Sequence, residues 1–116
     1  MKGKFGDKQR LQHMLDACTK ILLATKEYDL DKFVNDFIIT AATHTFIMII
    51  GEAAASITKE FKDDHPGFDW ALMKGMRNII VHEYFGVDDY RVWDTIVNDI
   101  PKLKINCENA LKELNL

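Results

Sequence analysis

The sequence predicts an all-α protein, folded as an antiparallel bundle of four to five helices. Apolar residues recur at the three- and four-residue spacing of helices with one buried face, and no stretch is typical of a strand. Two prolines and six glycines among 116 residues are too few for a sandwich of many tight turns. With 47% hydrophobic residues and no linker or repeat, we expect a single domain over residues 1–116.

The first two helices are expected before the middle of the chain. One spans residues 7–24, with Asp7 capping its start and an apolar face that holds Leu11, Met14, Leu15, Cys18, Ile21 and Leu22. The second follows an N-cap at Asp31 and runs to Phe61. Its roughly 45 Å is long for a compact bundle, so we expect it to bend near Gly51 or to extend into a partner.

Two further helical segments follow a loop that contains the sequence His-Pro-Gly. A third helix is expected from Asp69 towards Tyr84, with Gly86 at the C′ position that ends it. Asp88 is the expected N-cap of the fourth. Pro101 should then kink or restart this last segment, because proline lacks the N–H of a helix interior.

Charge and cysteine usage restrict the partners and the compartment. A net charge of −3 and a pI near 5.7 give no overall basic field, so contact with RNA needs a local patch from residues such as Lys74, Lys102 or Lys104. Cys18 and Cys107 lie far apart with no Cys/His cluster around them. We expect free buried thiols in a reducing cytosol in preference to a disulfide, and no metal site.

The most hydrophobic stretch, residues 38–57, is long enough to span a bilayer. It also contains His44, Glu52 and several hydroxyl residues, which favour a buried helix of a soluble protein. The basic start of the chain is followed by a polar, amphipathic segment, unlike a signal peptide. We therefore expect a cytoplasmic protein without membrane association.

The stretch "GMRNIIVHEYFG", residues 75–86, places Arg77, Asn78, His82, Glu83 and Tyr84 within eight residues. Arginine is always charged and presents a planar donor fork that suits a phosphate, while histidine takes or gives a proton near neutral pH. A histidine can deprotonate an RNA 2′-hydroxyl for attack on the adjacent phosphorus without a metal. Arg77 and His82 are thus candidates for phosphate chemistry, and Asn78 could orient the histidine or donate to the phosphate.

The spacing of this pair constrains how it could act. Five residues apart on one straight helix, Arg77 and His82 point about 140° away from each other. Either the helix distorts near its glycine end, or two copies of the motif face each other across a two-fold axis and supply the residues together. The same residues also have a structural interpretation: Arg77 pairs with a carboxylate such as Glu52, His82 lies on the surface, and Tyr84 packs at the helix end.

The wider context resembles a known family. The segments "FIMIIGEAAASI" at 46–57 and "HPGFDWALMKGMRNIIVHEYFGVDDYRVWDTIVNDIPKLK" at 65–104 are similar to the HEPN superfamily, and within it to the HepT-like toxins of bacterial and archaeal toxin–antitoxin pairs. The similarity centres on the R-x4-H-x-Y form of the family motif, here Arg77, His82 and Tyr84. It implies a helical homodimer whose motif helices line a cleft, acting as a metal-independent endoribonuclease on cellular RNA.

Residue roles follow from the resemblance. It implies Arg77 and His82 as the catalytic pair, with Asn78 and Glu52 shaping the site, and no cofactor or metal bound by this chain. Tyr84 matches the tyrosine that an MNT-type nucleotidyltransferase antitoxin, using ATP and magnesium, modifies with AMP. Such an anion beside the cleft would block RNA by bulk and by charge. The alternative is a non-catalytic partner or substrate-binding subunit of a nucleotidyltransferase.

Other conspicuous residues have structural roles in our interpretation. His44, in a stretch less charged than in many relatives, is expected as a satisfied histidine of the core or dimer interface in preference to a second catalytic one. His13 and His65 are expected to be surface groups. Trp70 and Trp93 are expected to be core or interface aromatics, with RNA stacking as the alternative for an exposed one.

Overall fold

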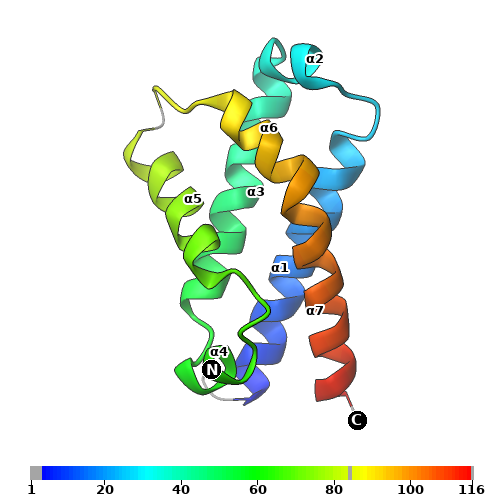
Figure 1. Ribbon diagram of the computed structural model, residues 1–116, viewed down its shortest axis with the longest axis vertical. Helices are drawn as coiled ribbons and strands as arrows, with labels where there is room; N and C mark the ends of the chain where they lie inside the picture. Colours follow the sequence, from blue (N-terminus) through cyan, green and yellow to red (C-terminus); the bar gives the residue numbers. More distant parts are fainter. Residues whose placement is uncertain (1–3, 84, 116) are drawn as a thin grey trace.

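The computed structural model describes residues 4–83 and 85–115, and these residues form helices and connections without a strand (Figure 1). The helices are α1 Lys4–Ala24, α2 Leu30–Val34, α3 Phe37–Ala55, α4 Lys59–Asp64, α5 Trp70–His82, α6 Asp89–Asn98 and α7 Ile100–Leu114. The long helices run alternately up and down: α1 up, α3 down, α5 up, and α6 with α7 down. The all-α antiparallel bundle predicted from the sequence is confirmed.

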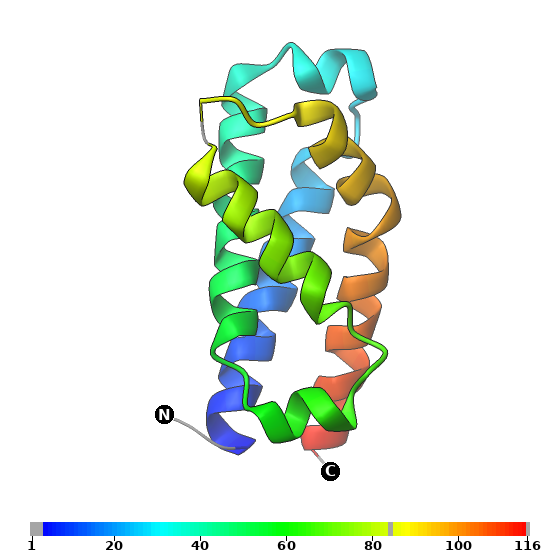
Figure 2. The same ribbon diagram turned by 60° about the vertical axis from the view of Figure 1, so that its left-hand side comes forward.

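α3 lies between α1 and α5 in the bundle. α1 packs against both α3 and α7, and α3 also packs against α5, which crosses it at an angle (Figure 2). The short α2 packs against α6 and α3 at one end of the bundle. The short α4 lies at the other end, near the start of α1. α5, which carries the motif, therefore has α3 as its main support.

The prediction of one long second helix over residues 31–61 is wrong. The chain forms three separate helices there, because acidic and hydroxyl side chains cap new helix starts. The Asp29 carboxylate accepts from the Lys32 amide at the start of α2, and Asp36 accepts from the Ile38 and Ile39 amides at the start of α3. The Tyr28 hydroxyl donates to Asp36 at 2.7 Å and fixes that cap. Asp31 therefore is not the cap.

Asp7 also has a different role from the one expected. It lies inside α1, which already includes Lys4, so it does not cap that helix. Its buried carboxylate instead accepts the Thr58 amide at 2.9 Å and the Thr58 hydroxyl at 2.7 Å. The Thr58 hydroxyl in turn caps α4. Asp7 thus anchors the start of α4 to α1.

The boundaries around the motif are partly as predicted. Asp69 caps α5 by accepting from the Leu72 amide, and Asp88 caps α6 by accepting from the Tyr90 amide. α7 restarts at Ile100 with Pro101 in its first turn, as expected. α5, however, ends at His82 with Glu83 as its C-cap, so Gly86 is not at C′. The predicted end at Tyr84 lies outside the described residues.

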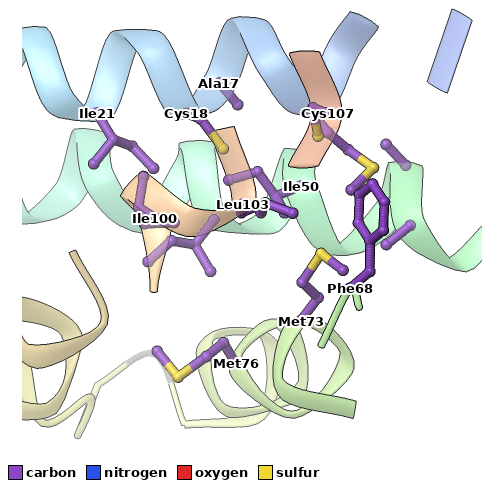
Figure 3. Close-up of a cluster of buried hydrophobic side chains, with 14 of the residues drawn as sticks. Ala17, Cys18, Ile21, Ile50, Phe68, Met73, Met76, Ile100, Leu103 and Cys107 are labelled. Carbon is purple, nitrogen blue, oxygen red and sulfur yellow. The ribbon is translucent and has the colours of Figure 1, made fainter. Parts of the chain in front are cut away.

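The core is built from apolar side chains of all seven helices and the α4–α5 loop. Among the largest fully buried side chains are Leu11, Met14, Ile21, Phe33 and Val92. Cys18 and Cys107 are buried there as free thiols, as predicted, and Figure 3 shows both within the cluster.

One of the described helices, α3, is long and apolar enough to cross a membrane by length and composition. Core helices pass the same test, so this is weak support for a membrane span. One face of α3 packs on α1 and α5 and buries Ile47, Ile50 and Gly51. The predicted buried helix is therefore present, although Phe37 and Ile38 at its start remain exposed.

Candidate active site

Arg77 lies where α5 crosses α3, and Gly51 makes that crossing possible. A Cβ placed on Gly51 would lie 2.3 Å from the Arg77 Cβ and 2.7 Å from its Cγ. Such distances are far below van der Waals contact, so only glycine lets the arginine stem lie directly on α3. Gly51 does not interrupt α3, which runs on as an α-helix to Ala55.

The Arg77 guanidinium is held by two neighbours. Its Nε and Nη2 lie 2.7 and 2.6 Å from Oε1 of Glu52, and its Nη1 donates to Oδ1 of Asn78 at 3.1 Å. The ion pair with Glu52 suggested by the sequence is thus present. Arginine has five N–H donors, so these contacts leave donors for a phosphate oxygen. Both partners fix the orientation of the guanidinium at a partly exposed position.

His82 is the last residue of α5 and is exposed to solvent. Within the described part of the chain it makes no hydrogen bond or ion pair. The Glu83 amide still bonds to the Ile79 carbonyl at 2.8 Å, so the last turn of α5 is regular. Arg77 and His82 therefore point about 140° apart within one copy, and the expected alternative of a distorted helix is not observed. Tyr84 lies outside the described residues.

A groove of about 420 Å³ lies beside Arg77, between α3, α4 and α5. We call it the α4–α5 groove. Its charged lining residues are Lys62, Lys74 and Arg77, and no carboxylate lines it. Asn78 and Trp70 complete its polar and aromatic walls, and its remaining lining residues are Gly51, Ala54, Ala55 and Ala71. The groove is thus a local basic patch on a chain whose net charge is −3.

The lysines expected to bind phosphate are only partly brought together. Lys74 lines the α4–α5 groove, as the sequence suggested. Lys102 instead lines a larger, mostly apolar pocket of about 480 Å³ formed with Met73 and Met76. Lys104 pairs with Glu108 along α7 at 3.4 Å. Lys102 and Lys104 therefore do not join Lys74 in this groove, because α7 packs on α1, and their contribution to phosphate binding stays a prediction.

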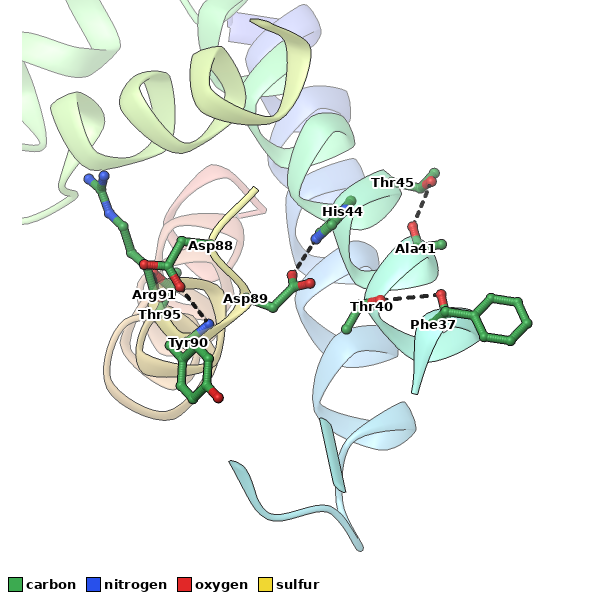
Figure 4. Close-up of polar contacts among 10 residues, drawn as sticks. All are labelled: Phe37, Thr40, Ala41, His44, Thr45, Asp88, Asp89, Tyr90, Arg91 and Thr95. Carbon is green, nitrogen blue, oxygen red and sulfur yellow. Dashed lines mark hydrogen bonds and ion pairs between the residues drawn. The ribbon is translucent and has the colours of Figure 1, made fainter. Parts of the chain in front are cut away.

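The other histidines have structural environments. His44 Nε2 lies 2.6 Å from Oδ1 of Asp89, which ties α3 to the start of α6, as Figure 4 shows. This confirms a satisfied, partly buried histidine. His13 is exposed on α1, as expected.

His65 is partly exposed, but it is not the surface group without partners that was expected. Its ring stacks on Phe61 at 3.8 Å, its Nδ1 lies 2.9 Å from the Phe61 carbonyl, and its Nε2 lies 3.1 Å from Glu113. Burial lowers the pKa of His65, but the hydrogen bonds to Glu113 and to the Phe61 carbonyl outweigh burial, so the pKa is raised above 6.5. Two acceptors facing the two ring nitrogens favour the protonated ring, which donates from both.

The tryptophans pack against other aromatic rings, as expected. Trp93 lies 5.2 Å from Phe33 between ring centroids. Trp70 stacks on Phe68 at 4.7 Å and donates its N–H to the His65 carbonyl. Trp70 is therefore rigidly held where it lines the groove.

The remaining reactive side chains lie away from Arg77. Burial raises the pKa of the Cys18 thiol to about 12 and that of Cys107 further still, so neither is a ready nucleophile. No group of three or more His, Cys, Asp or Glu residues in the described ranges is arranged to hold a metal ion. Metal independence of the site remains a prediction.

Comparison with known proteins decides the family. The family model described as ribonuclease HepT-like matches residues 14–110, well over half of the chain. The chain belongs to the HepT-like family. No solved structure gives a significant match to it.

Three relatives match this HepT-like chain over nearly the whole length of both proteins. A protein of Caldanaerobacter subterraneus subsp. tengcongensis, provisionally named as an RNase, is 35% identical over 89% of this chain and 92% of that protein. A Methanocaldococcus jannaschii protein with the same provisional name is 35% identical over 84% of this chain and 90% of its own. A Thermococcus cleftensis protein, provisionally named ribonuclease HepT, is 36% identical over 94% and 99%, respectively.

Sequence reasoning missed two parts of the site. It treated Gly51 as a bend, although a glycine directly before the acid that pairs with the motif arginine is a signal for close helix contact. It also gave no role to Lys62, because nothing in the local sequence indicates that α4 folds back beside α5. That position follows from the bond between Asp7 and Thr58, which are 51 residues apart.

Proposed function

We propose that this HepT-like protein is a metal-independent endoribonuclease that cuts cellular RNA with Arg77 and His82. The observation that carries the proposal is the Arg77 guanidinium, held by Glu52 and Asn78 beside a basic groove. The provisional ribonuclease names of the relatives support the same activity. In this proposal the chain itself needs no cofactor.

The reaction would use the RNA's own hydroxyl as nucleophile. His82 takes the proton of a 2′-hydroxyl, whose oxygen attacks the adjacent phosphorus, and the bond to the 5′ oxygen of the next nucleotide breaks. The leaving oxygen takes a proton from water, and the products are a 2′,3′-cyclic phosphate and a 5′-hydroxyl. Arg77 binds the phosphate oxygens and stabilises the charge that gathers on them in the transition state. Asn78 keeps the guanidinium in place.

We further propose that two copies form the site together. In one copy the regular α5 directs Arg77 and His82 to different sides, so a second copy must bring its own motif to complete the pair. The exposed face of α3 supports this, because Phe37 and Ile38 there are 81% and 66% exposed and Met48 and Ile49 continue the apolar stripe. Figure 4 shows the Phe37 ring pointing away from the bundle.

The stripe ends at Glu52, the partner of Arg77, so a second copy seated on it would lie beside the arginine. Exposed apolar surface of this kind on one helix face commonly marks an interface between proteins.

Regulation by an MNT-type nucleotidyltransferase antitoxin completes the proposal. Tyr84 follows His82 by two residues, so AMP attached to it would place a bulky anion next to the histidine. Such a group repels RNA phosphates and blocks access to the site. The protein would then be a cytoplasmic toxin that its partner neutralises by covalent modification.

The test is cleavage of total tRNA and of a generic single-stranded RNA by purified protein in EDTA. We expect wild type to cut, and Arg77→Ala and His82→Ala to be inactive while remaining folded and equally oligomeric. Absence of cutting by protein shown by mass to carry no AMP on Tyr84 would contradict the proposal. The acidic overall charge would then favour a non-catalytic, substrate-binding subunit of a nucleotidyltransferase.

A further inference from the structure

The two grooves that flank the Arg77–Glu52 pair differ in charge. The α4–α5 groove has three cations in its lining, Lys62, Lys74 and Arg77, and no carboxylate. On the other side, a groove of about 390 Å³ between α1 and α3 contains Arg10 but also Glu52. An RNA strand that reaches Arg77 carries a negative charge at each nucleotide, so the α4–α5 groove is the electrostatically favoured path.

Lys62 and Lys74 lie in the same groove as Arg77. Lys74 lies on the same face of α5 as Arg77, one turn earlier, at a rise of about 4.5 Å. Lys62 reaches the groove from α4, and its Nζ lies 5.7 Å from the centre of the Trp70 ring. Lys74 and Lys62 therefore offer charge to a phosphate that neighbours the one at Arg77.

The shape of the groove suits a single nucleotide. The small residues Gly51, Ala54, Ala55 and Ala71 are part of its lining and leave room for a sugar and base. Its volume of about 420 Å³ lies within the range of small-ligand pockets. Trp70 forms an aromatic wall whose orientation is fixed by Phe68 and by the bond to the His65 carbonyl. Aromatic walls receive bases of any sequence.

We propose that the α4–α5 groove is a nucleotide subsite for unpaired RNA. Lys62, whose Nζ lies over the Trp70 ring in this structure, turns with Lys74 to the phosphate of the nucleotide next to the scissile one, and the base of that nucleotide takes its place against Trp70. This inference rests on the proposed ribonuclease function and names the substrate as single-stranded, because the groove holds one nucleotide and not a base pair. Recognition is through phosphate and stacking, so the subsite has little base preference.

The test measures binding apart from cleavage. The probe is a fluorescent 2′-O-methyl RNA oligonucleotide, single-stranded or annealed to its complement, which lacks the attacking hydroxyl and so is not cut. The variants are Lys62→Met and Lys74→Met, which keep an apolar stem of similar length. The matched control is Lys59→Met, a lysine of the same α4 that is 89% exposed, pairs with Asp63 and does not line the groove.

We expect wild type to bind the single strand more tightly than the duplex. Each groove variant should weaken binding and reduce the slope of log affinity against log salt concentration by about 0.7, the change for one phosphate contact on a single strand. Lys59→Met should match wild type. Equal affinity and slope in all four proteins, or a preference for the duplex, would overturn the subsite.

The outcomes separate this inference from the proposed function. If wild type cuts natural RNA in EDTA but the groove variants bind as wild type does, the subsite is wrong and the ribonuclease stands. If the groove lysines control binding but wild type cuts nothing, the subsite stands as a binding site and the ribonuclease is wrong. If a polyglutamate peptide binds in a lysine-dependent way and RNA does not, the groove receives an acidic protein partner and the subsite is overturned.

Discussion

Replacing Gly51 by alanine should displace the motif helix. The new Cβ would lie 2.3 Å from the Arg77 Cβ, an atom fixed to the backbone that cannot rotate away, so α5 must move by about 1 Å to restore normal contact. Overpacking of this kind costs about 3 kcal/mol, and the better helix propensity of alanine returns about 1 kcal/mol. The net loss of about 2 kcal/mol corresponds to a fall in Tm of about 8 °C for a chain of this size.

Gly75, a glycine of α5, provides the control for Gly51 of α3. A Cβ on Gly75 would meet nothing within 4 Å, so Gly75→Ala should only gain helix propensity and raise Tm by about 4 °C. The assay is thermal unfolding followed by circular dichroism at one protein concentration, with RNA cleavage measured beside it. A shift of Arg77 by about 1 Å should lower the cleavage rate by about 100-fold. A Gly51→Ala protein as stable as Gly75→Ala would refute the close contact between α3 and α5.

Three other results are expected. Glu52→Gln should lower the cleavage rate about tenfold, because it weakens a charge-assisted hydrogen bond of about 1.5 kcal/mol that orients Arg77. The free energy of unfolding should change by less than about 1 kcal/mol, because the pair is partly exposed. The control Glu60→Gln on α4 should change neither the cleavage rate nor Tm. The folded-state pKa of His65 is raised above 6.5, so the stability that its charged form contributes is present below pH 6.5 and is lost as pH rises through the folded pKa. Glu113→Gln, which removes the partner of that charge, should therefore lower Tm in acidic buffer and have little effect at alkaline pH. An equal loss of Tm at both pH values would contradict the charged pair. Cys18 and Cys107 should resist a thiol reagent in the folded protein and react in denaturing guanidinium chloride, whereas rapid labelling of native protein would show that they are not buried thiols.

The sequence predicted the helix starts that depend only on a capping residue next to them. Asp69 and Asp88 cap α5 and α6 as expected, because an acid before an amphipathic run is enough to satisfy the free amides of a helix start. The same rule failed between Tyr28 and Asp36, where several aspartates compete. There the contact between Tyr28 and Asp36 helps fix which acid caps α3, and residue spacing does not reveal it.

Long-range contacts explain what the sequence did not show of the site. The motif and its charge partner were predictable, since Arg77 needs a carboxylate and Glu52 is available in an apolar helix. The role of Gly51 depends on how closely α5 approaches α3, which helical periodicity does not specify. The basic groove depends on Lys62, and so on the anchoring of α4 by Asp7. These relations exist only after the helices pack.

The most direct test of a site shared by two copies is the activity of a mixed dimer. Arg77→Ala and His82→Ala chains carrying different tags are co-expressed, and the dimer containing one of each is isolated through both tags. If arginine and histidine come from different copies, one of the two sites is intact and the mixed dimer should cut RNA in EDTA at about half the wild-type rate, although each parent is inactive. A mixed dimer as inactive as its parents, from a wild type that cuts, would contradict the shared site.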